Sequence, residues 1–184
     1  MATTASSRIR HRKAAQTLAV AAALGMGSTA YSQDSSADLA KKLSNPIASL
    51  ISVPFQLNHD HGYGPFDGDK TTLNIQPVIP ISLNADWNLI SRTILPVTYQ
   101  DDIAGPSGSQ FGLGDVVQSF FLSPSKPTEG GLIWGAGPVF LIPTATDDLL
   151  GGEKWGAGPT VVALKQDGPW TYGALANHIW SFAG

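Results

Sequence analysis

Few residues of this chain have types and spacings that could support chemistry, and His59, Asp60 and His61 are the first of them. Imidazole nitrogens and carboxylate oxygens are donors that Zn²⁺ binds in proteins. The spacing of these three residues matches no established metal motif, and the surrounding sequence is rich in glycine. We therefore expect a solvated polar loop here and predict no metal site.

The other candidates are two aspartate pairs and one Asn-His pair. Carboxylates are hard oxygen ligands for divalent cations, but the pairs at 101–102 and 147–148 fit ordinary loop solvation better. Asn177 and His178 would need a serine beside them to form a hydrolase site, and nothing in the sequence places one there. HExxH, GxSxG, P-loop and Rossmann motifs are absent, as is cysteine. We predict no enzymatic activity and no cofactor.

The N-terminal sequence has the layout of a secretory signal peptide. A basic start, with Arg and Lys between positions 8 and 13, precedes an apolar run at 14–26 and small residues near position 30. The apolar run is shorter than the roughly 20 residues that a membrane-spanning helix needs, so we expect cleavage rather than anchoring. We predict a signal peptide at 1–32 and a periplasmic segment at 33–48. A disordered basic leader on a cytosolic protein is the alternative.

Charge argues against nucleic-acid binding. Four of the 11 Lys and Arg residues precede Ser32, whereas all 14 Asp and Glu residues follow it, so the exported chain keeps seven basic residues and a formal charge of −7. Proteins that bind nucleic acids neutralise phosphates with clustered Lys and Arg, and no basic patch remains after cleavage. We predict no nucleic-acid partner.

Beyond the signal peptide, hydrophobicity alternates with the period-two pattern of strands that have one apolar face. Val53, Phe55 and Leu57 alternate with Gln56 and Asn58, and no window of about 18 apolar residues predicts a helical span. About seven strands are predicted, at 51–58, 72–84, 87–99, 111–123, 132–143, 155–166 and 170–182. Prolines lack the N–H that a sheet needs and predict bulges or kinks inside these strands. They are Pro54, Pro77, Pro80, Pro96, Pro138 and Pro159.

The connections between these strands alternate in length. Long polar segments are predicted at 59–69, 100–110 and 144–154, and short turns at 84–86, 124–130 and 167–169. This asymmetry is typical of outer-membrane barrels, which have short periplasmic turns and longer extracellular loops.

Large aromatic residues lie near both ends of the predicted strands, as in the aromatic belts of membrane proteins. Those near the short turns are Trp87, Trp134 and Trp170, and those near the long loops are Tyr99, Trp155 and Trp180. Core aromatics of a soluble sandwich are the alternative interpretation.

Charged residues are nearly absent from the predicted strand interiors, apart from Arg92 and Asp115. A charge facing lipid near the bilayer midplane costs about 2–4 kcal/mol, so this absence favours a membrane barrel. Arg92 shares a strand face with Asn88 and is expected to point inward, whereas the sequence does not place Asp115. The predicted lumen lining is Gln56, Asn74, Gln76, Asn88, Arg92 and Gln118.

Long contiguous stretches of the chain resemble one family. They are NPIASLISVPFQLN, LNIQPVIPISLNADWNLISRTILPV, FGLGDVVQSFF and GLIWGAGPVFLIPTATDDLLGGEKWGAGPTVVALKQDGPWTYGALANHIWSFAG. These stretches resemble the outer-membrane family associated with phenol degradation (MetA-pathway type). Its members are described as transporters, and some of them carry the label neuromedin U. The resemblance implies an outer-membrane β-barrel, surrounded by lipid, that passes small hydrophobic or aromatic compounds. No binding residues are carried over from the family.

We therefore expect an all-β fold, an antiparallel transmembrane β-barrel of the bacterial outer membrane over 49–184. The chain stops at Gly184, within the seventh predicted strand, and barrels of this kind have an even strand number. We expect a partial barrel, seen as an open, curved antiparallel sheet with two unpaired edges. The expected function is a passive channel or transporter. A structural or adhesive outer-membrane protein, and a soluble periplasmic β-sandwich binding module, are the alternatives, and the oligomeric state stays open.

Overall fold

The computed structural model describes residues 50–104, 106–167 and 170–184, which belong to the compact unit 32–184. The predicted signal peptide (1–32) and periplasmic segment (33–48) lie outside the described residues. In the described part of the chain, no helix is long and apolar enough to cross a membrane. The strands there are β1 (Phe55–Tyr63), β2 (Gly68–Ile75), β3 (Val78–Ser82), β4 (Trp87–Asp101), β5 (Ser109–Leu113), β6 (Val116–Pro124), β7 (Leu132–Ile142), β8 (Trp155–Asp167), β9 (Trp170–Asn177) and β10 (Trp180–Ala183).

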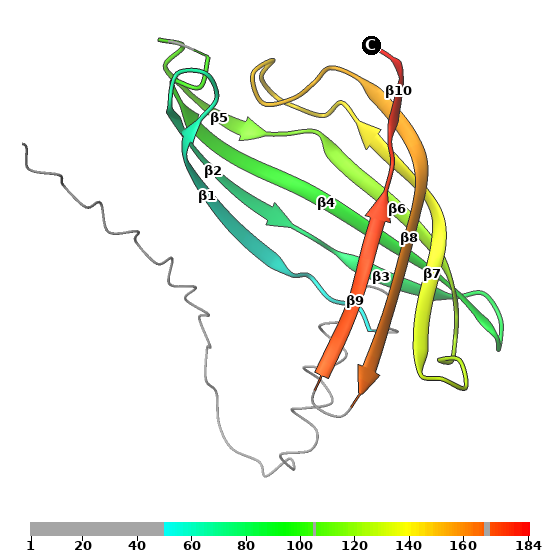
Figure 1. Ribbon diagram of the computed structural model, residues 1–184. Helices are drawn as coiled ribbons and strands as arrows, with labels where there is room; N and C mark the ends of the chain where they lie inside the picture. The colour runs from blue at the N-terminus through cyan, green and yellow to red at the C-terminus, as the bar shows by residue number, and fades with distance from the viewer. Residues whose placement is uncertain (1–49, 105, 168–169) are drawn as a thin grey trace, which may run out of the picture. The chain divides into compact units, whose positions relative to one another are not determined.

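These strands form one antiparallel sheet in the order β1-β2-β4-β6-β7-β8-β10, and Figure 1 shows that this sheet curls. β3 and β5 also pair with β4, and β9 also pairs with β8. β2 and β3 are therefore two segments of one strand, as are β5 and β6, and β9 and β10. The predicted all-β antiparallel fold is confirmed, and the strand positions along the sheet agree with the predicted number of about seven.

Both ends of the sheet are open within the described residues. β1 pairs only with β2 there, and β9 and β10 pair only with β8. The sheet is therefore a curled half-barrel with two edges, as the strand count predicted.

The prolines interrupt the sheet in different ways. Pro77 separates β2 from β3, whereas Pro138 and Pro159 stay inside β7 and β8 and lie directly opposite each other. Proline has no N–H to donate, and the neighbouring strands are irregular at these places. The pairing of β6 with β7 is interrupted next to Pro138, between positions 119 and 122 of β6. Pro159 lies beside the break between β9 and β10, where its carbonyl accepts the N–H of His178 at 3.1 Å.

A β-bulge separates β5 from β6. Val97 of β4 lies opposite Leu113, whereas Ile94 lies opposite Val117, so one extra residue is inserted on the β5–β6 side. Side chains alternate along a strand, and one inserted residue therefore reverses which parity of the numbering faces each side of the sheet.

The prediction of a long loop at 59–69 is wrong. β1 runs on to Tyr63 and β2 begins at Gly68, so only 64–67 form the turn. Positive φ angles at Gly64 and Asp67 close this turn tightly, and threonines at 71 and 72 suit the strand. The loop predicted at 100–110 is shortened to 102–108, and the loop predicted at 144–154 is observed at 143–154.

The two faces of the sheet differ. One face carries a cluster of buried apolar residues, Val78, Ile90, Phe121 and Val162, with Ile133 packed against it. The cluster extends over several strand positions, from Val78 of β3 to Val162 of β8, on the inner side of the curled sheet (Figure 1). We call this face the concave face, and the opposite one the convex face.

The convex face is apolar and exposed. Its residues alternate with those of the concave cluster along each strand, so they point away from it. Exposed examples along the strands are Phe55, Leu57, Ile79, Ile81, Tyr99, Phe111, Leu122, Phe140, Val161 and Tyr172. Exposed apolar side chains therefore recur on this face along most strands of the sheet.

Candidate functional site on the concave face

Five of the six predicted lumen residues lie on the concave face. Arg92 and Asn88 alternate with Ile90 of the buried cluster along β4, so all three point to the same side. Gln56 lies opposite Asn74, and the register of β2 against β4 places both on that side as well. The five are Gln56, Asn74, Gln76, Asn88 and Arg92.

Three of these side chains form a hydrogen-bonded row that we call the polar ladder, consisting of Arg92, Gln76 and Gln56. Arg92 Nη2 donates to Gln76 Oε1 at 2.6 Å, and Gln76 Nε2 donates to Gln56 Oε1 at 2.9 Å. Gln56 Nε2 then donates to Asn58 Oδ1 at 3.1 Å. Each side chain donates to the next in the same direction. The row of hydrogen bonds therefore runs from β4 across the β2–β3 strand to β1.

Arg92 brings a positive charge to this face without a carboxylate partner. Within the described residues, the one ion pair is that between His61 and Asp69, at the tip of another part of the sheet. A guanidinium has five N–H donors, and the ladder contact uses one of its nitrogens. Arg92 therefore has donor capacity left for a polar group on the concave side.

Gln118 does not belong to this group, and its assignment to the lumen is corrected. Its partner across β4 is Thr93, whereas Arg92 lies opposite Ser119. Gln118 accepts a hydrogen bond from Thr93 Oγ1 at 2.6 Å and donates to Ser91 Oγ at 3.0 Å, both on the convex face. The bulge between β5 and β6 is the cause, because it shifts the parity of β6 by one residue.

The loop between β7 and β8, residues 143–154, folds onto the concave face. Thr146 forms two hydrogen bonds with Leu113 of β5, one from its N–H to the carbonyl and one through its hydroxyl, each 3.0 Å. A side chain at Gly112 would meet Thr146 and Leu150, and Gly112 faces the same side as Thr98 of β4. We call this folded segment the inward loop. It occupies part of the concave side over β5 and the end of β4 that pairs with it.

Asp115 holds the inward loop in place. Its Oδ1 accepts the N–H of Ala145 at 3.2 Å, and its Oδ2 accepts the N–H of Gly152 at 2.7 Å. The carboxylate therefore joins both ends of the loop to the bulge between β5 and β6. Sequence reasoning did not place Asp115, because its position depends on the bulge.

Beneath the inward loop lie two glutamines that sequence reasoning missed. Gln100 is 0% exposed, and its Nε2 donates to Gln110 Oε1 at 3.1 Å and to the Leu149 carbonyl at 2.9 Å. Its Oε1 has no hydrogen-bond partner. Both glutamines were assigned to a loop, although Gln100 shares the parity of Arg92 in β4, which would have pointed to the concave face.

The aromatic residues of the two predicted belts alternate with concave residues and lie on the convex face. Trp87 and Trp134 make an edge-to-face contact with ring centroids 6.1 Å apart, beside the turns at 83–86 and 125–131. Trp170 pairs with Asp167 at the same end of the sheet. At the opposite strand ends lie Tyr99, Trp155 and Trp180. These residues thus lie toward the two ends of the strands, on the convex face.

The concave face offers hydrogen-bond donors and acceptors to a polar group. Its chemistry is hydrogen bonding by amides and hydroxyls, together with the guanidinium of Arg92 and the carboxylate of Asp115. No family model, curated protein or solved structure matches the chain. What the chain does is therefore inferred from its two faces.

Proposed function

We propose that this chain is part of an outer-membrane β-barrel that acts as a passive channel or transporter for small hydrophobic or aromatic compounds. The observation that supports it most is the distribution of side chains on the sheet. Antiparallel sheets of soluble proteins bury their apolar face and expose their polar one. Here the convex face is exposed and largely apolar, and the polar ladder with Arg92 lies on the concave face beside the apolar cluster. A bilayer outside and water inside account for this arrangement.

The aromatic levels support the same surroundings. Indole and phenol groups favour the membrane interface, because the ring is buried while its N–H or O–H stays hydrated. Trp87 and Trp134 would lie at the periplasmic interface and Tyr99 and Trp155 at the outer one, with lipid as the partner of the convex face. Export through a cleaved signal peptide over 1–32 belongs to this proposal.

The class of solute follows from Arg92 and the resemblance to the phenol-degradation family. A guanidinium is attracted to the face of an aromatic ring, and its unused N–H donors suit a phenolic oxygen. A small aromatic compound with one polar substituent would contact the guanidinium of Arg92 with its ring face and the unused N–H donors with its substituent. Catalysis is not part of the proposal.

A structural barrel without flux is the second candidate, and two observations favour it. The cluster around Phe121 fills the concave side at one level, and the inward loop covers Gln100 at another. If both obstructions persist in the membrane, no solute passes. The soluble sandwich is less well supported, because the described strands form one sheet and a sandwich needs two packed face to face.

The test is expression of the full reading frame with its own N-terminus, followed by cell fractionation and by denaturing electrophoresis of unheated and heated membranes. Heat-modifiable migration in the outer-membrane fraction is the expected result. Phenol should then enter liposomes that contain the purified protein faster than it enters protein-free liposomes of the same lipid. A barrel without flux would favour the structural candidate, and recovery in the soluble periplasm would overturn both.

A further inference from the structure

Two histidines on β1 lie side by side near the tip of the first hairpin. β1 and β2 stay paired up to this tip, with His59 opposite Thr71 and His61 opposite Asp69. Residues two apart on a strand point to the same side, so both imidazoles lie on one face, away from Asp60. The sequence predicted a solvated polar loop here, which says nothing of where these side chains point. The extended hairpin fixes their direction.

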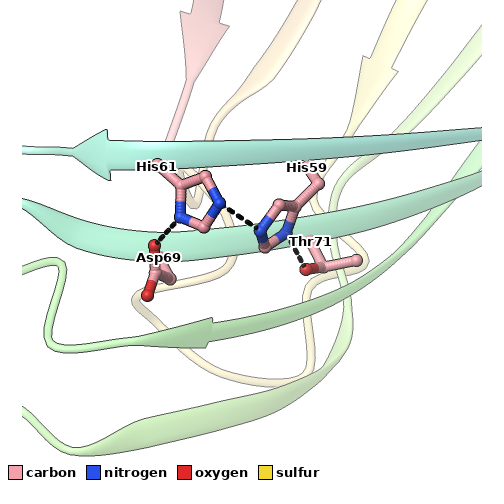
Figure 2. A network of polar contacts seen from close by, with 4 residues as sticks. All are labelled: His59, His61, Asp69 and Thr71. Atoms are coloured by element: carbon pink, nitrogen blue, oxygen red, sulfur yellow. Dashed lines mark hydrogen bonds and ion pairs between the residues drawn. The ribbon is translucent and has the colours of Figure 1, made fainter. Parts of the chain in front are cut away.

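The two rings meet in a T-shaped arrangement with centroids 4.2 Å apart, and their Nε2 atoms are joined by a contact of 3.0 Å, drawn as a dashed line in Figure 2. Each ring also has a partner at its other nitrogen. His61 Nδ1 lies 2.6 Å from Asp69 Oδ1, and His59 Nδ1 lies 2.7 Å from Thr71 Oγ1. The side chains of His61 and Asp69 are 75% and 57% exposed. They lie on the convex side but beyond the level of Tyr99, since Asp69 is opposite Asp101, so ions in solution can reach them.

One of the two tautomers of His59 leaves the space between the two Nε2 atoms available for a cation. A carboxylate only accepts hydrogen bonds, so a neutral His61 carries its proton on Nδ1 and presents a lone pair at Nε2. With its proton on Nε2, His59 donates to this lone pair and accepts from the Thr71 hydroxyl. With its proton on Nδ1, His59 donates to Thr71 instead, and the two Nε2 lone pairs, 3.0 Å apart, can then bind one cation.

We propose that His59 and His61 form a chelating site for one borderline transition-metal cation, Zn²⁺ or Ni²⁺, bound by both Nε2 atoms. With metal–nitrogen bonds of about 2.0–2.1 Å, two ligands are about 2.9 Å apart at a right angle and about 3.3 Å apart in a tetrahedron. The observed 3.0 Å lies between these values. Imidazole is a preferred ligand of these metals.

The neighbours of the histidines fit the same role. Metal-binding histidines commonly donate their second ring N–H to a carboxylate, which fixes the tautomer and makes the ring more basic. Asp69 does this for His61, and Thr71 holds His59. Among the described residues, no group of three or more His, Cys, Asp or Glu side chains is placed to hold a metal. Water would therefore complete the coordination sphere, and the bound ion would exchange.

The experiment is a calorimetric titration of the full chain, purified without a histidine tag, with Zn²⁺ or Ni²⁺ alone. We expect one saturable equivalent, lost in His59→Gln and in His61→Gln. Asp69→Asn should weaken binding about tenfold to a hundredfold. His178→Gln is the matched control, because this histidine makes an edge-to-face contact with Trp180 in another part of the sheet, and its replacement should leave binding unchanged.

Unchanged gel migration and circular dichroism of each variant would establish that it is folded. Wild-type protein that takes up no equivalent would overturn the site, and so would His59→Gln and His61→Gln variants that bind as tightly as the wild type. The readout is metal binding, so the site stands or falls independently of any transport activity.

Discussion

Arg92 of β4 donates a 2.6 Å hydrogen bond to Gln76, a residue at the point where Pro77 ends the regular pairing of β2. Gln76 is 9% exposed, so its amide has little access to water. The nearly buried amide of Gln76 thus contacts the guanidinium directly beside the interruption at Pro77. The irregular part of the strand and the polar ladder meet at this residue.

Replacing Arg92 should destabilise the sheet and alter flux. In Arg92→Gln, the shorter side chain leaves Gln76 Oε1 without its charged donor, and an unsatisfied buried acceptor costs about 1–3 kcal/mol. We expect a lower urea midpoint of unfolding in detergent and slower passage of phenol into liposomes. Lys126→Gln is the control, because Lys126 is exposed in the turn before β7. Equal flux in both variants would remove Arg92 from the solute path.

Releasing the inward loop should open the concave face. Asp115→Ala removes both acceptors that hold the N–H groups of Ala145 and Gly152. We expect faster protease cleavage within 143–154 and increased flux, measured on the same liposome preparation. Asp148→Asn changes a charge in the same loop and is the control. Cleavage at wild-type rates in Asp115→Ala would contradict the anchoring role.

The sequence predicted the strands well because alternation is a local property. Val53, Phe55 and Leu57 show their face without knowledge of any partner, and five lumen residues were found in this way. Gln118 was misplaced because a single inserted residue near Asp115 changes the parity of β6, and nothing in the local alternation records that insertion. The pairing of Gln118 with Thr93 of β4 determines which face Gln118 lies on.

Features that depend on contacts between distant segments were not predictable. The inward loop rests on bonds between residues about 30 positions apart, such as Leu113 with Thr146. Likewise, His59 and His61 were assigned to a loop because glycines and aspartates surround them. Their alignment follows from pairing with Thr71 and Asp69 on β2, which the residue types around the turn did not indicate.

The sequence WGAGP occurs twice, at 134–138 and at 155–159, and close backbone approach should make one glycine in each copy intolerant of a side chain. A Cβ at Gly137 would meet the carbonyl of Phe120, and one at Gly158 would meet the carbonyl of His178. Neither backbone group can move without disturbing a strand, so overpacking by Gly137→Ala or Gly158→Ala should cost about 1–3 kcal/mol. Urea unfolding measures this cost. Gly130→Ala is the control, because its nearest contact would be 4.0 Å away. Equal midpoints in all three variants would contradict the packing.

An arginine at Val161 should distinguish lipid from water on the convex face. Val161 is 48% exposed, in the middle of β8 and opposite Ala136 and Ala176. A soluble sheet tolerates arginine at such a site within about 0.5 kcal/mol, whereas lipid near the midplane imposes about 2–4 kcal/mol. Leu132, 40% exposed at the start of β7, is the matched control, because the same substitution near the interface costs only about 0–1 kcal/mol.

The two variants are compared by unfolding in lipid vesicles. A large loss at position 161 with a small loss at 132 requires a hydrocarbon layer whose depth varies along the strand, since exposure alone is similar at both sites. Equal small losses would place the convex face in water. In that case the polar ladder could no longer be a pore lining, because no membrane would separate the two sides of the sheet.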